Sequence, residues 1–161
     1  MTMRIRIDID RQELELFDAD GACIRRYLVS TASNGVGECN DSGCTPRGRH
    51  RIRARIGVGM PLGTVFRGRR PTGEIWTPEL AASNPERDWI LSRILWLCGE
   101  ESGINRGGRV DSMRRYIYIH GTGEDQPMGK PRSHGCIRMR NCDVIELFEL
   151  VSVGTPVEIV G

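Results

Sequence analysis

The chain has 161 residues, of which 39% are hydrophobic and 27% are charged, a balance typical of a globular protein. This is the length of one compact domain with its own core, so we expect residues 1–161 to form a single domain. No stretch approaches the roughly 20 apolar residues of a membrane span, which argues against a membrane protein. The net charge of +2 lacks the strong basic field of nucleic-acid binders.

The first ten residues alternate apolar and charged side chains, without the continuous apolar segment and cleavage site of a secretory signal. We therefore expect a cytoplasmic protein, and a periplasmic one is the alternative if a leader has been removed. Six cysteines in a chain of this length do not resemble a disulfide scaffold. In a reducing compartment most of them are expected to be small buried hydrophobic residues.

Alternation of apolar and charged residues predicts strands at the start of the chain. The pattern runs over residues 4–10 and is repeated over 14–16. A turn over 18–21 leads to a third strand over 23–31, which is rich in β-branched and aromatic residues. Together these segments predict an antiparallel meander.

The middle of the chain indicates loops around one regular strand. Residues 33–48 contain four glycines and no apolar periodicity, which predicts a long loop. Over 49–56 arginines occupy alternate positions and share one face of a predicted strand. Neither aromatic stacking platforms nor a larger basic patch accompany them, so we expect no nucleic-acid partner. Glycine and proline interrupt 57–87, which predicts a loop with a short helical turn over 79–83, able to form one wall of a cleft.

Two further strands are expected in the second half. Residues 89–97 are apolar and fit either a buried strand or a short helix, of which we choose the strand. A glycine-rich loop over 99–111 then leads to a strand over 115–119, rich in aromatic and β-branched residues. This strand delivers His120 at its end.

One helix is expected near the C-terminus. Apolar residues recur at helical spacing over 144–151, with Asn141 as the predicted N-cap and Gly154 as the stop. Residues 155–160 close the chain as a strand. The predicted protein is therefore mainly β, with one helix.

Cys136 has candidates around it for every role in acyl transfer. A thiol becomes a useful nucleophile when a base or a positive charge favours the thiolate, and the tetrahedral intermediate needs donors aimed at its oxyanion. His134 lies two residues before Cys136, and His120 lies at the predicted strand end. Gly135 lets the main chain turn its N–H groups toward a bound carbonyl, and Arg138 could hold an anionic substrate group.

Two other interpretations fit the same residues. The histidines could be structural and Cys136 an inert buried thiol, because Cys–His pairs arise readily by chance. The second histidine and the flanking glycines argue against that interpretation. A zinc site is the other alternative, but no Cys-x2-Cys or His-x3-His spacing is present, so we expect neither a metal nor a cofactor. The potential zinc ligands are Cys39, Cys44, His50, His120, His134, Cys136 and Cys142.

One run of residues combines His120-Gly121-Thr122, Gly129 and Ser133-His134-Gly135-Cys136-Ile137-Arg138-Met139. It resembles the signature of the L,D-transpeptidase (YkuD-like) catalytic domain, and its order and spacing make it far more specific than a lone Cys–His pair. Residues 45–48 are similar to the Thr-Pro-x-Gly of that family, whereas 57–87 match nothing in its pattern. The resemblance implies a mainly β, single-domain, mixed β-sandwich or barrel-like fold with one main α-helix near the C-terminus.

The resemblance also implies catalytic roles. Cys136 would attack the carbonyl of the L-centre of meso-diaminopimelate in a murein tetrapeptide, releasing the terminal D-alanine and leaving a thioester on the enzyme. His120 would be the general base, and the backbone carbonyl of Gly121 would orient its ring. His134 would assist beside the oxyanion donors.

The same resemblance assigns substrate-binding roles to Ser133, Gly135 and Arg138. The N–H groups of Gly135 and Cys136 would be the oxyanion donors. Arg138 stands where many family members carry Asn, and it would bind polar groups or the carboxylate of the substrate.

The acceptor of the thioester decides the overall reaction, because the first half-reaction is shared. Water gives an L,D-carboxypeptidase, and an amine gives a cross-link. Since the mature wall lies outside the cytoplasm, we expect a cytoplasmic L,D-carboxypeptidase that acts on soluble muropeptides in peptidoglycan recycling. The alternatives are a periplasmic L,D-transpeptidase that cross-links the wall and a catalytically inactive peptidoglycan-binding module. Peptidoglycan stem peptides are the expected partner, with no membrane partner.

Overall fold

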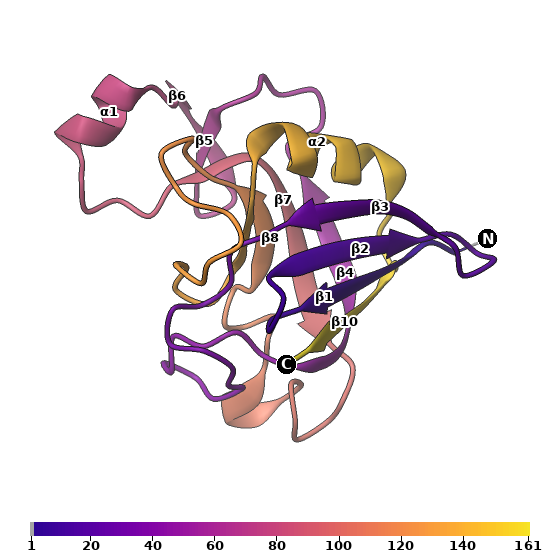
Figure 1. The fold of residues 1–161 in the computed structure, drawn as a ribbon. Helices are drawn as coiled ribbons and strands as arrows, with labels where there is room; N and C mark the ends of the chain where they lie inside the picture. The colour runs from indigo at the N-terminus through magenta and orange to yellow at the C-terminus, as the bar shows by residue number, and fades with distance from the viewer. Residues whose placement is uncertain (1) are drawn as a thin grey trace.

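The computed structural model describes residues 2–161 and shows a mainly β protein built around one curled sheet (Figure 1). The strand order is β3-β2-β1-β10-β4-β7-β5-β6, with β8 beside β7 and β9 beside β8. Neither α-helix within residues 2–161 is long and apolar enough to cross a membrane. The elements are β1 (Arg4–Asp8), β2 (Glu13–Phe17), β3 (Cys23–Leu28), β4 (Gly48–Ile56), β5 (Thr64–Arg67), β6 (Arg70–Ile75), α1 (Pro78–Ser83), β7 (Ile90–Gly99), the 3-10 turn η1 (Gly108–Val110), β8 (Tyr118–Gly121), β9 (Ile137–Met139), α2 (Asn141–Leu150) and β10 (Pro156–Val160).

The predicted N-terminal meander is confirmed. β1 pairs antiparallel with β2, and β2 pairs antiparallel with β3. Ile5 and Ile7 are fully buried, as the alternating pattern requires. β1 also pairs in parallel with β10, so the first and last strands lie side by side. The strands predicted over 49–56, 89–97 and 155–160 are present as β4, β7 and β10.

The helix α2 covers one face of the sheet, and Cys136 packs against the opposite face. Leu147 and Phe148 of α2 share a buried cluster with Ile119 of β8 and Ile137 of β9. Because side chains alternate along a strand, the neighbours of these two isoleucines point to the other face. That face carries a second apolar cluster, against which Cys136 packs.

The prediction of a loop over 57–87 is wrong for its central part, which forms the hairpin β5–β6. Val65 and Phe66 are buried and pair with β7. The hairpin was missed because the glycines and prolines of this segment indicated a loop, but β6 is an edge strand, where Pro71 is tolerated. The predicted helical turn is present as α1, capped by the side chain of Thr77. The hairpin and α1 project together from the sheet, at the upper left of Figure 1.

The arginine face predicted for 49–56 is interrupted. A bulge between Ile52 and Ala54 shifts the register of β4 against β7. Arg51 and Arg53 are exposed, whereas the guanidinium of Arg55 lies 4.0 Å from the ring centroid of Phe148 in α2. The extra residue at this bulge therefore turns Arg55, the last arginine of the predicted face, toward α2.

Three predicted boundaries also differ. The strand expected over 115–119 begins only at Tyr118, because Tyr116 has a positive φ of 56° that breaks the extended backbone. The N-cap of α2 is Arg140 rather than Asn141, whose side chain accepts a hydrogen bond from Ser92 Oγ at 2.7 Å. The helix ends at Leu150, before the predicted stop.

His50 is a structural histidine in β4. Its side chain is 1% exposed, with Nε2 at 2.8 Å from Ser112 Oγ and Nδ1 at 3.1 Å from the carbonyl oxygen of Gly48. Burial lowers the pKa of His50 from 6.5 to about 4. The folded protein therefore keeps this ring neutral in a pH range where the unfolded chain protonates it.

We predict that His50 makes the protein less stable in mild acid. The contribution is fully present above pH 6.5 and is lost as the pH falls through about 4. It amounts to about 3 kcal/mol of unfolding free energy. Denaturant unfolding measured between pH 7 and pH 4 should show this loss, and His50→Gln should make the slope shallower, leaving the part that other groups such as the buried His120 contribute. Equal slopes in the two proteins would contradict the prediction.

Candidate active site

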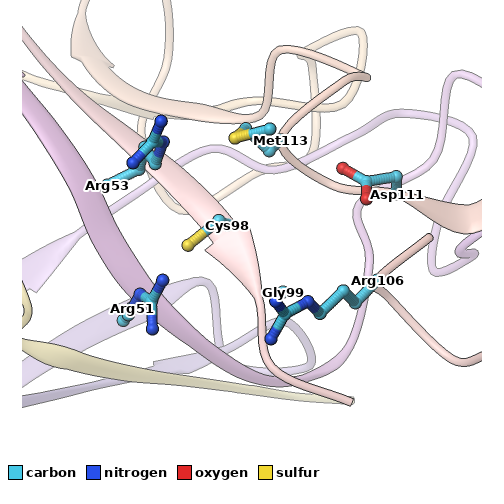
Figure 2. Close-up of a pocket in the computed structure, with 7 residues that line it drawn as sticks. All are labelled: Arg51, Arg53, Cys98, Gly99, Arg106, Asp111 and Met113. Atoms are coloured by element: carbon cyan, nitrogen blue, oxygen red, sulfur yellow. The ribbon is translucent and has the colours of Figure 1, made fainter. Parts of the chain in front are cut away.

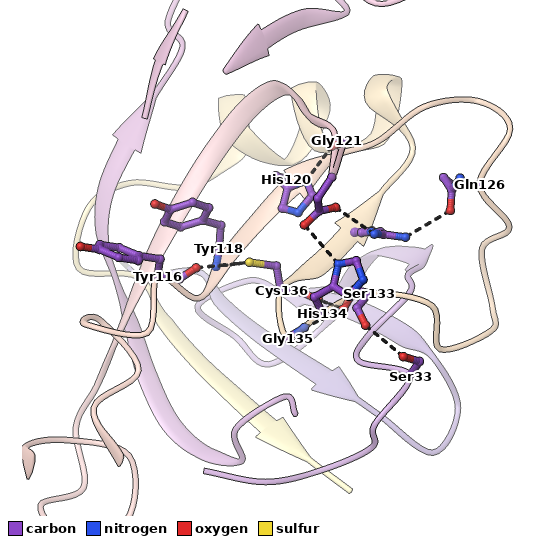
Figure 3. A network of polar contacts seen from close by, with 12 residues as sticks. Ser33, Tyr116, Tyr118, His120, Gly121, Gln126, Ser133, His134, Gly135 and Cys136 are labelled. Atoms are coloured by element: carbon purple, nitrogen blue, oxygen red, sulfur yellow. Dashed lines mark hydrogen bonds and ion pairs between the residues drawn. The ribbon is translucent and has the colours of Figure 1, made fainter. Parts of the chain in front are cut away.

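Two short parallel strands bring Cys136 and His120 to the same face of the sheet. β8 and β9 pair with Ile119 opposite Ile137 and His120 opposite Arg138. Cys136 immediately precedes β9, so the register places it diagonally from His120. In Figure 3 the thiol of Cys136 lies between the ring of His120 on one side and Tyr116 and Tyr118 on the other. Sequence reasoning did not predict β9, which is only three residues long.

The tautomer of His120 is set by the backbone. The ring is 1% exposed, and Nδ1 lies 2.6 Å from the carbonyl oxygen of Gly121. A carbonyl can only accept, so Nδ1 carries the proton and Nε2 is left as the acceptor. Burial lowers the pKa of His120, against the opposing effects of Asp88 and of the Gly121 carbonyl. The ring is therefore a neutral base at neutral pH.

Close packing explains why residue 121 is glycine. A Cβ atom on Gly121 would lie 2.7 Å from the carbonyl oxygen of Leu91 and would overlap the side chain of Asn141. Any side chain here would push β8 away from β7 and from the start of α2. The carbonyl that orients His120 is held in place by this contact.

The thiol of Cys136 is half-buried and hydrogen-bonded to the backbone. Its Sγ accepts from the N–H of Tyr118 and donates to the carbonyl oxygen of Tyr116, both at 3.3 Å. The positive φ of Tyr116 belongs to the turn that presents this carbonyl. Burial raises the pKa of Cys136 to about 12, although the Tyr118 N–H opposes the shift. The resting group is thus a protonated thiol bound to the main chain rather than to the ring of His120.

The cysteine loop is held by two hydroxyl groups. Ser133 Oγ donates to the carbonyl oxygen of Cys136 at 2.5 Å and accepts from the N–H of Gly135 at 3.2 Å. Thr45 Oγ1 donates to the carbonyl oxygen of Gly135 at 2.9 Å. Gly135 has a φ of 134°, a conformation that favours glycine. Thr45, from the segment matched to Thr-Pro-x-Gly, therefore fixes the loop that carries the thiol.

Arg138 and His134 both contact a carboxylate that sequence reasoning missed. An Arg138 Nη atom lies 2.9 Å from one oxygen of Asp88, and His134 Nδ1 lies 3.5 Å from the other. The Arg138 side chain is only 7% exposed, whereas that of His134 is 73% exposed. The sole sequence signal for Asp88 is its place before the strand predicted over 89–97, and nothing in the pattern pairs it with Arg138.

Two hollows border this site. One of about 710 Å³ is lined by Asp88, and another of about 510 Å³ is lined by Tyr116 and His134. A third hollow of about 230 Å³ lies elsewhere on the sheet, around Cys98 and three exposed arginines (Figure 2). Within residues 2–161, no group of three or more His, Cys, Asp or Glu side chains is arranged to hold a metal ion. The arginines of the third hollow are Arg51, Arg53 and Arg106.

We predict that free Cys136 reacts slowly with iodoacetamide, because the thiolate is the reactive form and its pKa is raised to about 12. At pH 8 the exposed Cys39 and Cys142 should be labelled first, and labelling of Cys136 should still be rising at pH 10. Peptide mass spectrometry over a time course measures each site separately. Labelling of Cys136 ahead of Cys39 and Cys142 at pH 7 would show that the resting thiol is not protonated.

Sequence comparison connects this geometry to known proteins. The family model of the L,D-transpeptidase catalytic domain (YkuD) matches residues 2–159. The Probable L,D-transpeptidase ErfK/SrfK of Salmonella typhimurium is 48% identical over 94 residues, which make up 57% of this chain and 29% of that protein. The Probable L,D-transpeptidase YbiS of Escherichia coli is 48% identical over 46 residues, or 29% of this chain and 15% of that protein.

Solved structures share the fold. An L,D-transpeptidase from Mycobacterium smegmatis matches with a TM-score of 0.61 at 19% identity, over 99% of this chain and 58% of that chain. The L,D-transpeptidase LdtMt1, solved in complex with imipenem, matches with a TM-score of 0.58 at 17% identity, over 99% of this chain and 59% of that chain. The chain thus spans less than two thirds of each relative named here. Because the family model matches nearly its whole length, the chain belongs to the L,D-transpeptidase catalytic-domain (YkuD) family.

Proposed function

We propose that this protein is a cysteine acyltransferase that acts on peptidoglycan tetrapeptides. Cys136 would attack the carbonyl of the L-centre of meso-diaminopimelate and release the terminal D-alanine through a thioester. The observation that carries the proposal is the buried, neutral ring of His120, whose Nδ1 is tied to the Gly121 carbonyl at 2.6 Å on the sheet face that holds the thiol. Membership of the L,D-transpeptidase family supports this class of reaction.

The first half-reaction begins with the thiol leaving its resting place. A rotation about the Cα–Cβ bond of Cys136 would break its contact with the Tyr116 carbonyl and turn Sγ toward Nε2 of His120. His120 then takes the thiol proton as Sγ bonds to the substrate carbonyl carbon. As the C–N bond to D-alanine breaks, His120 returns that proton to the leaving amine.

The oxyanion of the tetrahedral intermediate needs a donor near Cys136. The N–H of Gly135 already donates to Ser133 Oγ within the loop. We therefore assign the oxyanion contact to the N–H of Cys136, with Ser133 and Thr45 shaping the loop. His134 has an exposed side chain beside Asp88, and in this proposal it would contact bound peptide.

We propose water as the acceptor of the thioester, with cytoplasmic muropeptides as the substrate. The product would then be a tripeptide, and the protein an L,D-carboxypeptidase of peptidoglycan recycling. This part of the proposal concerns only the acceptor, because the first half-reaction is the same for hydrolysis and for transfer to an amine.

A second candidate is an L,D-transpeptidase that joins two stem peptides in the periplasm. The two hollows of about 710 and 510 Å³ that border the site favour it, because a donor and an acceptor peptide each need a place to lie. A catalytically inactive peptidoglycan-binding module is the third candidate. The protonated, backbone-bound thiol of the resting state is compatible with that candidate.

Product analysis separates the three candidates. The enzyme is incubated with tetrapeptide, alone and with an added diaminopimelate-bearing amine. We predict tripeptide and free D-alanine in both cases, with no turnover by Cys136→Ala and a loss of roughly 100-fold or more in His120→Ala, because general base catalysis is removed. Cross-linked or exchanged product would establish the transpeptidase, and absence of any product from a folded wild-type protein that binds tetrapeptide would establish the binding module.

A further inference from the structure

Asp88 contacts two residues of the candidate site, but the reaction steps proposed above give it no role. It lies in the segment between α1 and β7, directly before the buried Trp89. One carboxylate oxygen contacts Arg138 at 2.9 Å, and the other lies 3.5 Å from His134. A single carboxylate therefore joins one residue from β9 and one from the cysteine loop.

The contact with Arg138 is an ion pair whose guanidinium is buried. The Arg138 side chain is 7% exposed, and burying a guanidinium without a counter-charge is costly. Its second Nη atom donates to Gln126 Oε1 at 3.2 Å, and within residues 2–161 its Nε has no partner. These contacts use two of the five N–H donors of the guanidinium, so in the part of the chain that the structure describes three donors, including the Nε–H, stay free for a substrate group.

The pair also lies beside the proposed base. Arg138 is directly opposite His120 in the β8–β9 register. When His120 takes the thiol proton, a second positive charge appears next to the guanidinium in a buried site, where repulsion is strong. The Asp88 carboxylate is the group that offsets both charges.

The electrostatics agree with this geometry. Burial is the largest influence on His120 and lowers its pKa; the charge of Asp88 works to raise that pKa, and the charge of Arg138 works to lower it. Burial acts to raise the pKa of Asp88, but the charges of His120, Arg138 and His134 outweigh it and leave that pKa below its usual value. The carboxylate therefore remains charged at neutral pH.

We infer that Asp88 is a positioning residue of this site, which holds Arg138 in place and balances the positive charge that forms on His120 during acyl transfer. The inference rests on the proposed function. It assigns Arg138 to the electrostatic balance of the site in addition to any contact with substrate. The segment that carries Asp88 follows the projecting hairpin and α1, so this part of the chain completes the site.

The test follows acylation of the intact protein by imipenem across pH, with the site of attachment established by mass. Asp88→Asn should lower the maximal rate by roughly 10-fold or more. It should also move the acidic limb of the pH profile to lower pH, because the charge of Asp88, which raises the pKa of His120, is lost while the charge of Arg138, which lowers that pKa, remains. The groups that face Asp88 are His120 on β8, Arg138 on β9, and His134 and Cys136 in the cysteine loop, with the Glu74–Arg87 ion pair in the neighbouring hollow.

Two further variants control for general damage. Glu74→Gln removes a carboxylate from the same hollow, where it is paired with Arg87 at 2.9 Å, and it should leave the acidic limb unmoved. The double variant Asp88→Asn/Arg138→Gln removes both charges and should return the limb toward that of the wild type, even if both variants are less stable. A merely structural role would lower the rate without moving the limb.

The inference is overturned if Asp88→Asn leaves the limb in place, or if the double variant shifts it as far as the single one does. Failure of the proposed function looks different, because the wild-type protein itself would then not be acylated at Cys136. The thermal unfolding midpoints of all variants are recorded so that rates are compared only between folded proteins.

Discussion

The hydrogen bond between His120 Nδ1 and the Gly121 carbonyl is the constraint on which this site depends. It assigns the ring proton to Nδ1 and leaves Nε2 free to accept. The bond in turn needs the close approach of Gly121 to β7 and to the first residue of α2, where no side chain fits. The packing of a strand against its neighbours thus determines which nitrogen of one imidazole can act as a base.

The resting site avoids isolated buried charge. The thiol is protonated, His120 is neutral, and the buried guanidinium of Arg138 is paired with Asp88. This arrangement limits the cost of burial, because separate charges would each lose solvation. In the proposed reaction, proton transfer from Cys136 to His120 would create a pair of opposite charges only as Sγ bonds to the substrate carbonyl carbon.

Patterns of residues predicted most of the fold. Period-two alternation located β1, β2 and β4, and helical spacing located α2, because each of these elements buries one regular face. The β5–β6 hairpin was missed because its glycines and prolines are typical of loops. β6 lies at the edge of the sheet, where a strand can contain Pro71. The bulge in β4 was missed because one extra residue in a strand does not show in the alternation of arginines with other residues along the sequence.

The sequence signature brought the cysteine, both histidines, Gly121 and Arg138 into consideration, and the structure gathers these residues around β8 and β9. It could not predict two contacts that depend on tertiary structure. Asp88 is fifty positions from Arg138 in the chain, with no periodic relation between them. The Tyr116 carbonyl reaches the thiol only through a backbone conformation that residues of its type rarely adopt.

The most direct measurement of the central claim is NMR of the imidazole nitrogens in protein labelled at histidine, with the His120 signals identified by their loss in His120→Gln. The account predicts a ring that is neutral at pH 7, carries its proton on Nδ1, and titrates below the usual range of histidine because it is buried. A ring protonated on Nε2, or one that is already an imidazolium at pH 7, would contradict it.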